Sequence, residues 1–452
     1  MKRGTPRRDF LKGSALAGVG FWVTGSCVAQ DSKSPNEKLQ IASIGVGGKG
    51  SSDCDQANNH GKVIAICDVD DNHLKQKSEK FPDAVKFNDY REMLTKMERE
   101  IDAVTVSTAD HTHAHASIMA MRLGKHVYCQ KPLTHTVWEA RMMREAARKY
   151  RVATQMGNQG TAENGLREAV EVVRSGAIGG VHEIHCWTNR PVWPQAPQIT
   201  SRPAESVEPP KHVHWDLFLG PAPHRPYNAA YHPFKWRGWW DYGTGALGDM
   251  ACHTANMAFM ACNLTYPKSV YAEAGDVNPE TYPTWAKVTL EFAGSRSMPP
   301  VKFVWYEGKK DGQKLLPPAD LLHGENPPGS GSLIVGDKGV LYSPNDYGAA
   351  YRLLPTDNFK DFKKPEPYMP RNGRGDDGMK AEWIAAAKGG PPAMSNFEYA
   401  GTLTETILLG NIAIRFAGTK LDWDGPHLRF TNHPKANQYV SKEYRKGWEI
   451  EV

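Results

Sequence analysis

The chain lacks several features that mark other classes of protein. After residue 29 no stretch is apolar enough to cross a membrane, so no integral membrane span is expected. Residues 1–29 hold five basic residues against one acidic residue, which leaves about +1 of the net charge of +5 for the rest of the chain. A balance so close to neutral gives no electrostatic reason to expect a nucleic-acid partner or binding to an acidic membrane surface.

Cysteine is also sparse and forms no metal-binding or redox motif. The six cysteines after residue 29 contain no Cys-x-x-Cys pair; they are Cys54, Cys67, Cys129, Cys186, Cys252 and Cys262. An even number permits disulfides, but the spacings require none. The histidines at 111–115 and 182–185 lack acidic or thiolate partners at ligand spacing, so no metal site is expected.

The N-terminus has the composition of a targeting segment. Arg7 and Arg8, followed by Phe-Leu-Lys, precede a short apolar run at 15–23. This order resembles the bacterial twin-arginine export signal. We therefore expect residues 1–29 to be a signal peptide that sends the protein to the periplasm or otherwise out of the cytoplasm. Cys27 is a candidate for lipidation, and plain cleavage two residues later is the alternative.

After a polar linker at 30–38, short β-rich runs alternate with amphipathic helices. The runs predict strands at 39–44, 63–67, 101–107, 126–129 and 152–156, with helices after the glycines at 45–50 and at 89–99, 114–123 and 137–150. Such alternation is typical of a parallel sheet with helices on both faces. Residues 39–160 are therefore expected to form a doubly wound Rossmann domain.

The composition and the order of the predicted elements change beyond residue 160. A helix at 165–174 and a strand at 181–188 precede a long stretch rich in Pro, Trp and His that reaches about residue 240. Further strands are predicted at 269–274, 286–292, 302–306 and 332–335. Residues 161–452 are expected to form an α+β domain with a large, open, mostly antiparallel sheet, which binds substrate and forms oligomers. A late apolar helix near 399–416 is expected to pack back on the first domain.

A glycine motif points to a dinucleotide. Gly45, Gly47, Gly48 and Gly50 fit G-x-G-x-x-G directly after a predicted strand and before a predicted helix. Such glycines allow a tight turn, close approach to a pyrophosphate and close helix–strand packing. The next strand ends at Asp68, about where a carboxylate meets the adenosine ribose in such folds.

Asp68 also favours one cofactor over the other. A carboxylate accepts hydrogen bonds from free ribose hydroxyls and repels a 2′-phosphate, so NAD is favoured over NADP. The neighbouring Asp70 and Asp71 add no basic group to reverse this preference.

Residues 107–113 (Ser-Thr-Ala-Asp-His-Thr-His) and 124–132 (Gly-Lys-His-Val-Tyr-Cys-Gln-Lys-Pro) carry a family resemblance. They resemble the central signature of the glucose–fructose oxidoreductase/inositol dehydrogenase (Gfo/Idh/MocA) family, whose next strand ends in Glu-Lys-Pro. The resemblance implies an NAD-dependent oxidoreductase of sugars or polyols. It implies that Thr108 binds the cofactor and that His113 lies near the nicotinamide.

The resemblance gives Lys131 a catalytic role. It implies that this lysine lies near the nicotinamide and a substrate hydroxyl, where a cation favours alkoxide-like charge as hydride leaves. The sequence departs from the family at one position, because Gln130 stands where Glu is usual. Glutamine keeps hydrogen bonds but supplies no charge.

A second pair fits proton transfer. On a helix beginning near Gly248, Asp249 and His253 would lie one turn apart on the same face. The resemblance implies that this histidine is the acid/base, and a carboxylate can orient an imidazole and raise its basicity. We therefore expect Lys131, Asp249 and His253 to be catalytic.

The Trp-rich stretch is a candidate substrate region. Six of the thirteen tryptophans lie between Trp187 and Trp240, among arginines, histidines and an asparagine. Aromatic faces suit sugar rings and polar groups suit hydroxyls, although core packing is an equal alternative for the cluster. The candidates for substrate binding are Asn189, Arg190, Trp193, Trp236 and Arg237.

Three functions remain open at this point. The first is hydride transfer between a sugar or glycoside and tightly bound NAD, since little free nicotinamide exists outside the cytoplasm. The second is an NAD-dependent glycosidase of the glycoside hydrolase family 109 type, which shares this fold and works by oxidation, elimination, hydration and reduction. The third, a cofactor-binding sensor, is disfavoured by the presence of Lys131, Asp249 and His253. We also expect a homo-oligomer, either a dimer or a tetramer.

Overall fold

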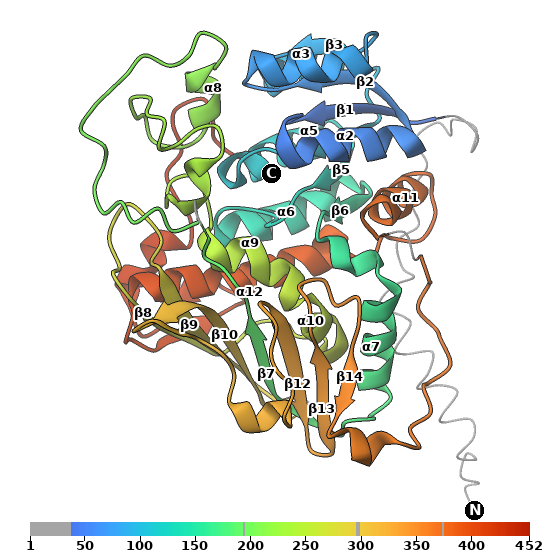
Figure 1. The fold of residues 1–452 in the computed structure, drawn as a ribbon. Coiled ribbons are helices and arrows are strands. Elements are labelled where there is room, and N and C mark those ends of the chain that lie inside the picture. Colours follow the sequence, from blue (N-terminus) through green and yellow to red (C-terminus); the bar gives the residue numbers. More distant parts are fainter. Residues whose placement is uncertain (1–37, 193–194, 295–298, 373–374) are drawn as a thin grey trace, which may run out of the picture.

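The structure is a computed structural model that describes residues 38–192, 195–294, 299–372 and 375–452. The predicted signal peptide, including Cys27, lies outside the described residues, as does Trp193. Two sheets make up the architecture, with the helix α12 between them (Figure 1).

The first sheet has six parallel strands in the order β3-β2-β1-β4-β5-β6. Their bounds are β1 Gln40–Ile44, β2 Lys62–Cys67, β3 Val85–Phe87, β4 Ala103–Val106, β5 His126–Cys129 and β6 Thr154–Met156. The order reverses at β1 and β4, so the carboxyl ends of these two strands flank the crevice where doubly wound sheets bind ligands.

Helices cover both faces of this sheet because its buried strands are apolar on both sides. They are α2 Gly48–His60, α3 Asp71–Lys80, α4 Tyr90–Lys96, α5 His113–Arg122 and α6 Val137–Tyr150. Asp70 caps α3 and Asp89 caps α4, each through a side-chain oxygen that accepts a backbone N–H. Thr136 and Glu139 form a reciprocal capping box on α6.

The second sheet has ten strands, and its path runs β14-β13-β12-β7-β10-β9-β8-β15-β16, with β11 paired to β10. Its described pairs are antiparallel except for β7 and β10, which run parallel. The bounds are β7 Val181–Trp187, β8 Ser269–Ala274, β9 Trp285–Phe292, β10 Val301–Lys310, β11 Gln313–Lys314, β12 Gly331–Gly336, β13 Gly339–Ser343, β14 Arg352–Leu354, β15 Leu421–Asp424 and β16 Arg429–Phe430.

The remaining helices belong to the second part of the chain. They are α7 Asn164–Arg174, α8 Trp215–Leu219, α9 Gly245–Thr254, α10 Asn256–Cys262, α11 Gly375–Ala387 and α12 Phe397–Arg415. The apolar α12 packs against α6 on one side and against β8 and β9 on the other. Helix α11 packs against α2, and its Trp383 joins the core beneath that helix. The C-terminal part of the chain thus completes the N-terminal core.

The Trp-rich stretch docks on the first domain. Its buried aromatic cluster, which includes Trp215, Trp239 and Tyr242, packs against Val69 and Ala109 in loops that follow β2 and β4. Val213 forms an antiparallel bridge with Asp70. The segment, green in Figure 1, therefore reaches from the second sheet to the edge of the crevice.

The predicted fold class is confirmed: a Rossmann domain with a parallel sheet, followed by an α+β domain with a large, mostly antiparallel sheet. Several boundaries differ. The helix expected at 89–99 is Tyr90–Lys96, and the one expected near Gly248 begins at Gly245. The six described cysteines are free and buried. Among the described residues no helix is both long and apolar enough to cross a membrane.

Candidate active site

The glycine loop joins β1 to α2 and faces the crevice. Gly45 has a φ of +78°, and a Cβ there would lie 2.5 Å from the Ser107 carbonyl oxygen at the end of β4. A Cβ at Gly50 would lie 2.0 Å from the Gly45 carbonyl oxygen, so only glycine lets α2 pack this close. Gly48 begins α2, and a Cβ there would meet nothing within 4 Å. This open cradle at a helix N-terminus fits a pyrophosphate.

Asp68 lies beside this loop at the end of β2, as expected. Its Oδ2 accepts hydrogen bonds from the backbone N–H groups of Val46 at 2.8 Å and Gly47 at 3.2 Å. The His73 ring lies 3.4 Å from the other oxygen. The hydrogen bond with Asp68 outweighs burial and raises the pKa of His73. A basic group that the sequence analysis missed therefore stands next to the carboxylate that is expected to meet the ribose.

Lys131 and Asp249 form the central ion pair of the crevice. Lys131 follows β5 and Asp249 lies on α9, and the structure brings them together across 118 residues of sequence. The Lys131 Nζ donates to Asp249 Oδ1 at 2.5 Å and to the Asp249 carbonyl oxygen at 3.0 Å. Their side chains are 14% and 11% exposed, so the pair is largely buried.

Asp249 has two further partners that the sequence analysis did not assign to it. Arg237 lies 3.2 Å from Oδ1, and the Gln195 side-chain amide donates to Oδ2. Burial alone would raise the pKa of Asp249, but Lys131 and Arg237 outweigh it and hold the pKa far below its usual value. The carboxylate is therefore ionised and fully engaged with these donors.

His253 lies one helical turn after Asp249, but the expected hydrogen bond between them is not among the contacts of the described residues. Two cations and an amide donor hold the carboxylate more strongly than a neutral imidazole could. The buried Nδ1 of His253 has no described partner, and the ring packs edge-on against Tyr347 at 4.8 Å between centroids. Burial and Lys131 lower the pKa of His253 well below its usual value. The imidazole is therefore neutral at physiological pH, and burial and Lys131 outweigh the increase in basicity that Asp249 was expected to give it.

Thr108 and His113 lie on the same rim. His113 is 1% exposed, and its ring nitrogens lie 2.8 Å from the Pro132 carbonyl oxygen and 3.0 Å from the Thr108 carbonyl oxygen. Burial would lower the pKa of His113, but Cys129, Asp110 and the Pro132 carbonyl outweigh it and raise the pKa to about 9. His113 thus ties the loop after β4 to the turn that carries Lys131.

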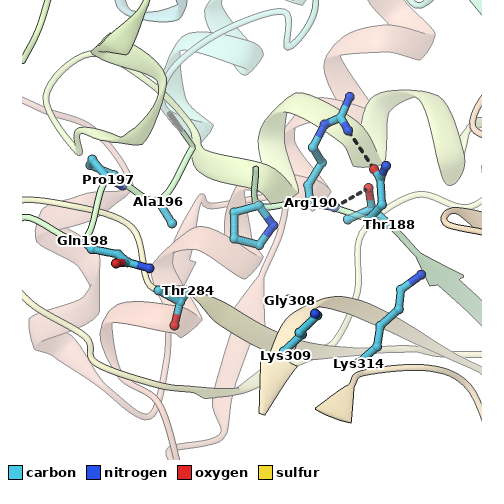
Figure 2. Close-up of a pocket in the computed structure, with 11 residues that line it drawn as sticks. Thr188, Arg190, Ala196, Pro197, Gln198, Thr284, Gly308, Lys309 and Lys314 are labelled. Carbon is cyan, nitrogen blue, oxygen red and sulfur yellow. Dashed lines mark hydrogen bonds between the residues drawn. The ribbon is translucent and has the colours of Figure 1, made fainter. Parts of the chain in front are cut away.

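The described substrate candidates divide into two groups. Asn189 and Arg190 line a cavity of about 540 Å³ at the end of β7, together with Lys309 and Lys314. Figure 2 shows Arg190 on one side of this cavity and the loop 196–198 on the other. Trp236 is 7% exposed and belongs to the buried aromatic cluster, so it packs as core, with the Arg237 guanidinium 4.4 Å from its ring centroid.

No group of three His, Cys, Asp or Glu side chains suited to a metal occurs within 38–192, 195–294, 299–372 and 375–452. The residues around the crevice instead suit an organic dinucleotide. They offer a glycine cradle, a carboxylate at the end of β2 and an unpartnered buried imidazole nitrogen.

Comparison with known proteins places this site in a family. An oxidoreductase family model with an NAD-binding Rossmann fold, Gfo/Idh/MocA, matches residues 39–158. The model of that family's C-terminal alpha/beta domain matches residues 174–298. The chain belongs to this oxidoreductase family. The resemblance seen in the signature at 107–113 and 124–132 is thereby confirmed.

The chain matches less than half of the length of these two curated relatives. A glycosyl hydrolase family 109 protein of Solibacter usitatus is 31% identical over 194 residues, which are 39% of this chain and 44% of that protein. An inositol 2-dehydrogenase of Salmonella typhimurium is 25% identical over 126 residues, which are 27% of this chain and 37% of that protein.

Solved structures support the fold along most of the chain. The WlbA dehydrogenase from Bordetella pertussis, in complex with NADH and UDP-GlcNAcA, superimposes with a TM-score of 0.60 at 15% identity, covering 86% of this chain and 99% of that one. An aldose-aldose oxidoreductase from Caulobacter crescentus gives a TM-score of 0.56 at 17% identity, covering 86% and 100%. At such identities these likenesses concern the fold.

Three residues of the site escaped the sequence analysis. Tyr347 and Gln195 lie in irregular segments with no motif, and His73 lies in the first turn of α3. Only the spacing of His73, five residues after Asp68, offered a signal that could have found it.

Proposed function

We propose that the protein is an NAD-dependent oxidoreductase that acts on a secondary alcohol of a sugar or glycoside. The observation that carries this proposal is the contact between Lys131 and Asp249 beside the neutral, buried His253. A cationic donor and a proton acceptor in one crevice are the two groups that alcohol oxidation requires.

When bound, NAD supplies the acceptor for the hydride that leaves the alcohol carbon. His253 takes the hydroxyl proton, because its imidazole is neutral and buried and has an unpartnered nitrogen. Lys131 stabilises the negative charge that develops on the alcohol oxygen as the proton leaves. Asp249 keeps Lys131 in position, and its carboxylate offsets one of the two positive charges that Lys131 and Arg237 bring to the site. The step balances, because the hydride with its two electrons would leave with the cofactor, the hydroxyl proton would reside on His253, and the alcohol would become a carbonyl.

Cofactor preference and retention are part of the proposal. Asp68 supports NAD over NADP, since its carboxylate would repel a 2′-phosphate. The imidazole of His73 opposes this preference, because a basic group beside Asp68 would attract a 2′-phosphate. His73→Ala should therefore strengthen discrimination against NADP. Tight retention is supported by the docking of the Trp-rich stretch, where the His214 N–H donates to the Val69 carbonyl at 2.8 Å and the Asp71 N–H donates to the His212 carbonyl at 2.9 Å.

A glycosidase is the second candidate, because the family 109 relative is 31% identical. In that reaction a transient ketone acidifies the neighbouring C–H bond, the aglycone leaves, water adds, and the same cofactor returns the hydride. The net reaction is hydrolysis without net cofactor change. His253 and Lys131 would serve the oxidation and reduction steps unchanged.

We further propose export by the twin-arginine route, with Arg7 and Arg8 as the recognised pair, and assembly as a dimer or tetramer. The basic and apolar composition of residues 1–29 supports export. Cell fractionation tests the first proposal, and light scattering of the purified protein tests the second.

A substrate panel decides between the two reactions. The purified protein is incubated with NAD and myo-inositol, glucose and p-nitrophenyl glycosides, while absorbance at 340 nm and product masses are recorded. Net NADH with a product two mass units lighter supports the oxidoreductase, and nitrophenol release without net NADH supports the glycosidase. Lys131→Met should abolish either signal, whereas the control Lys302→Met, at an ion pair whose lysine side chain is 55% exposed, should keep it. Neither signal from a protein that binds NADH would contradict both proposals.

A further inference from the structure

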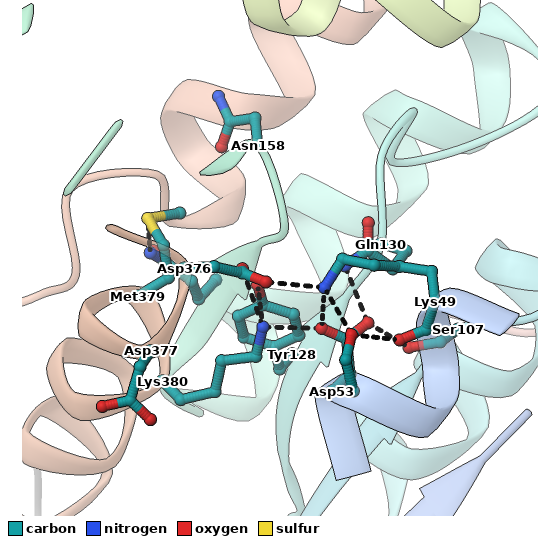
Figure 3. Close-up of polar contacts among 12 residues, drawn as sticks. Lys49, Asp53, Ser107, Tyr128, Gln130, Asn158, Asp376, Asp377, Met379 and Lys380 are labelled. Carbon is teal, nitrogen blue, oxygen red and sulfur yellow. Dashed lines mark hydrogen bonds and ion pairs between the residues drawn. The ribbon is translucent and has the colours of Figure 1, made fainter. Parts of the chain in front are cut away.

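A charge quartet, in which Asp53 and Lys380 are fully buried and Lys49 and Asp376 are partly exposed, adjoins the glycine loop. Lys380 on α11 is 0% exposed, and its Nζ donates to Asp53 Oδ1 at 2.6 Å, to Asp376 Oδ1 at 2.9 Å and to the Tyr128 hydroxyl at 3.0 Å. Lys49 from the glycine loop donates to Asp53 Oδ1 at 2.5 Å and to Asp376 Oδ2 at 2.7 Å. Figure 3 shows these contacts as one connected network. Two ammonium groups and two carboxylates make the quartet neutral.

The second oxygen of Asp53 reaches the catalytic turn. Asp53 Oδ2 accepts from the Ser107 hydroxyl at 2.9 Å and from the Gln130 side-chain amide at 2.8 Å. The Gln130 amide oxygen in turn accepts the backbone N–H of Lys131 at 3.3 Å. A Cβ at Gly157 would lie 2.5 Å from the Gln130 amide nitrogen, so the glycine at 157 leaves the space that this amide occupies.

This arrangement accounts for glutamine where the family usually has glutamate. Asp53 already supplies the buried carboxylate, from α2 instead of from position 130. A glutamate at that position would set a third carboxylate against Asp53 Oδ2, where an amide hydrogen now lies. Like charges at that distance in a buried site are strongly unfavourable.

We propose that Asp53 is a positioning residue for the catalytic lysine: it fixes Gln130, and through it the 130–132 turn, so that Lys131 reaches Asp249. This inference rests on the proposed role of Lys131 in catalysis. Lys380 keeps Asp53 ionised and oriented, because it is fully buried and uses all three of its hydrogens within the network. The charge balance of the quartet therefore depends on which residue occupies position 130.

The test is a charge-exchange cycle with Gln130→Glu, Asp53→Asn and the double variant. Gln130→Glu adds a charge and should displace the turn. The double variant again has two carboxylates and two ammonium groups. Its new amide at position 53 can donate to the new carboxylate at position 130, so it should recover. Because Gln130→Glu is expected to lower stability, melting temperatures are recorded for all variants with and without NADH. The double variant keeps the test informative if Gln130→Glu unfolds.

The position of Lys131 is read without a substrate, by its rate of acetylation with acetic anhydride relative to the exposed Lys363. In the native protein the ion pair with Asp249 protects Lys131, and Asp249→Asn sets the unprotected rate. Gln130→Glu should raise the relative rate about tenfold, and the double variant should return it to near the native value, since contacting residues couple by such amounts. The alcohol of the panel that gives the most NADH should show the same pattern in kcat, with KM less changed.

Gln155→Glu is the matched control, because Gln155 is also buried, at 0% exposed against 5% for Gln130, but contacts Met379 and the Ser395 N–H instead of Asp53. Adding Asp53→Asn should not rescue it. Native acetylation in Gln130→Glu, or no recovery in the double variant, would overturn the proposal. Acetylation that follows the cycle while the panel yields neither NADH nor nitrophenol supports the positioning role and counts against the proposed reactions alone.

Discussion

The contact between α6 and α12 depends on a buried glutamate that can be tested directly. Glu405 on α12 is 1% exposed and accepts from Arg141 at 2.8 and 2.9 Å, one distance to each oxygen. Arg144 adds a third contact at 3.2 Å. Since α6 belongs to the Rossmann domain and α12 to the second part of the chain, Glu405 joins the two halves.

Glu405→Gln keeps the shape of the side chain and removes its charge. Removing one partner of a buried ion pair costs about 3–5 kcal/mol, and the lower end applies because the glutamine oxygen still accepts a hydrogen bond. Unfolding entropy is roughly 2.1 cal/mol/K per residue, so about 400 folded residues give roughly 0.8 kcal/mol/K. A loss of about 3 kcal/mol should therefore lower the melting temperature by about 4 °C.

Differential scanning calorimetry measures this shift, and the same helix provides the control. Glu398 lies seven residues earlier on α12 and contacts Arg144 at 2.7 Å and Arg148 at 2.6 Å, but its side chain is 48% exposed. Glu398→Gln should cost less than about 1 kcal/mol, as exposed pairs do. Equal shifts for the two variants would refute the argument that burial, and not contact distance, sets the cost.

Four further outcomes are expected. Burial raises the pKa of Glu307 to about 8, above its unfolded value of 4.5. The folded protein therefore loses stability relative to the unfolded chain as the pH rises from 4.5 to 8. The difference in stability between the native protein and Glu307→Gln should change over that window and level off above it. His253→Ala should lower turnover about a hundred- to ten-thousand-fold with NADH affinity unchanged in fluorescence titration, and an unchanged rate at a chemically limited step would make His253 structural. Asp68→Ala should weaken NAD and relax discrimination against NADP in the same titration, whereas equal affinities in the native protein would contradict the cofactor proposal. Replacing Arg7 and Arg8 with lysine should leave the precursor in the cytoplasm of fractionated cells, and full export would exclude the twin-arginine route.

The sequence by itself determined the elements that depend on local patterns. Hydrophobic runs located five of the six strands of the Rossmann sheet to within about two residues, because side-chain burial repeats with the period of the backbone. The edge strand β3 was missed, because its three residues are exposed or half-buried and form no hydrophobic run. The glycine loop was equally predictable, since Gly45 and Gly50 occupy positions where a Cβ would collide with backbone. The carboxylate at the end of β2 followed from its fixed place in such a unit.

Only the tertiary structure decided which charges meet. The spacing of Asp249 and His253 suggested a pair, yet Asp249 binds Lys131, Arg237 and Gln195, which come from other parts of the chain. Helical spacing brings two side chains within reach, but the partner of a buried carboxylate is the strongest donor that the fold delivers to it.

The same reason applies to the buried network and to the Trp-rich stretch. Lys380 lies in a segment without a motif, and it acts on the site only through its ion pair with Asp53, which is 327 residues away in the sequence. The tryptophans at 215 and 239 form a core that docks on the loops after β2 and β4, which composition could not distinguish from a sugar-binding surface. Burial and charge compensation depend on contacts between distant segments, and these exist only once the chain has folded.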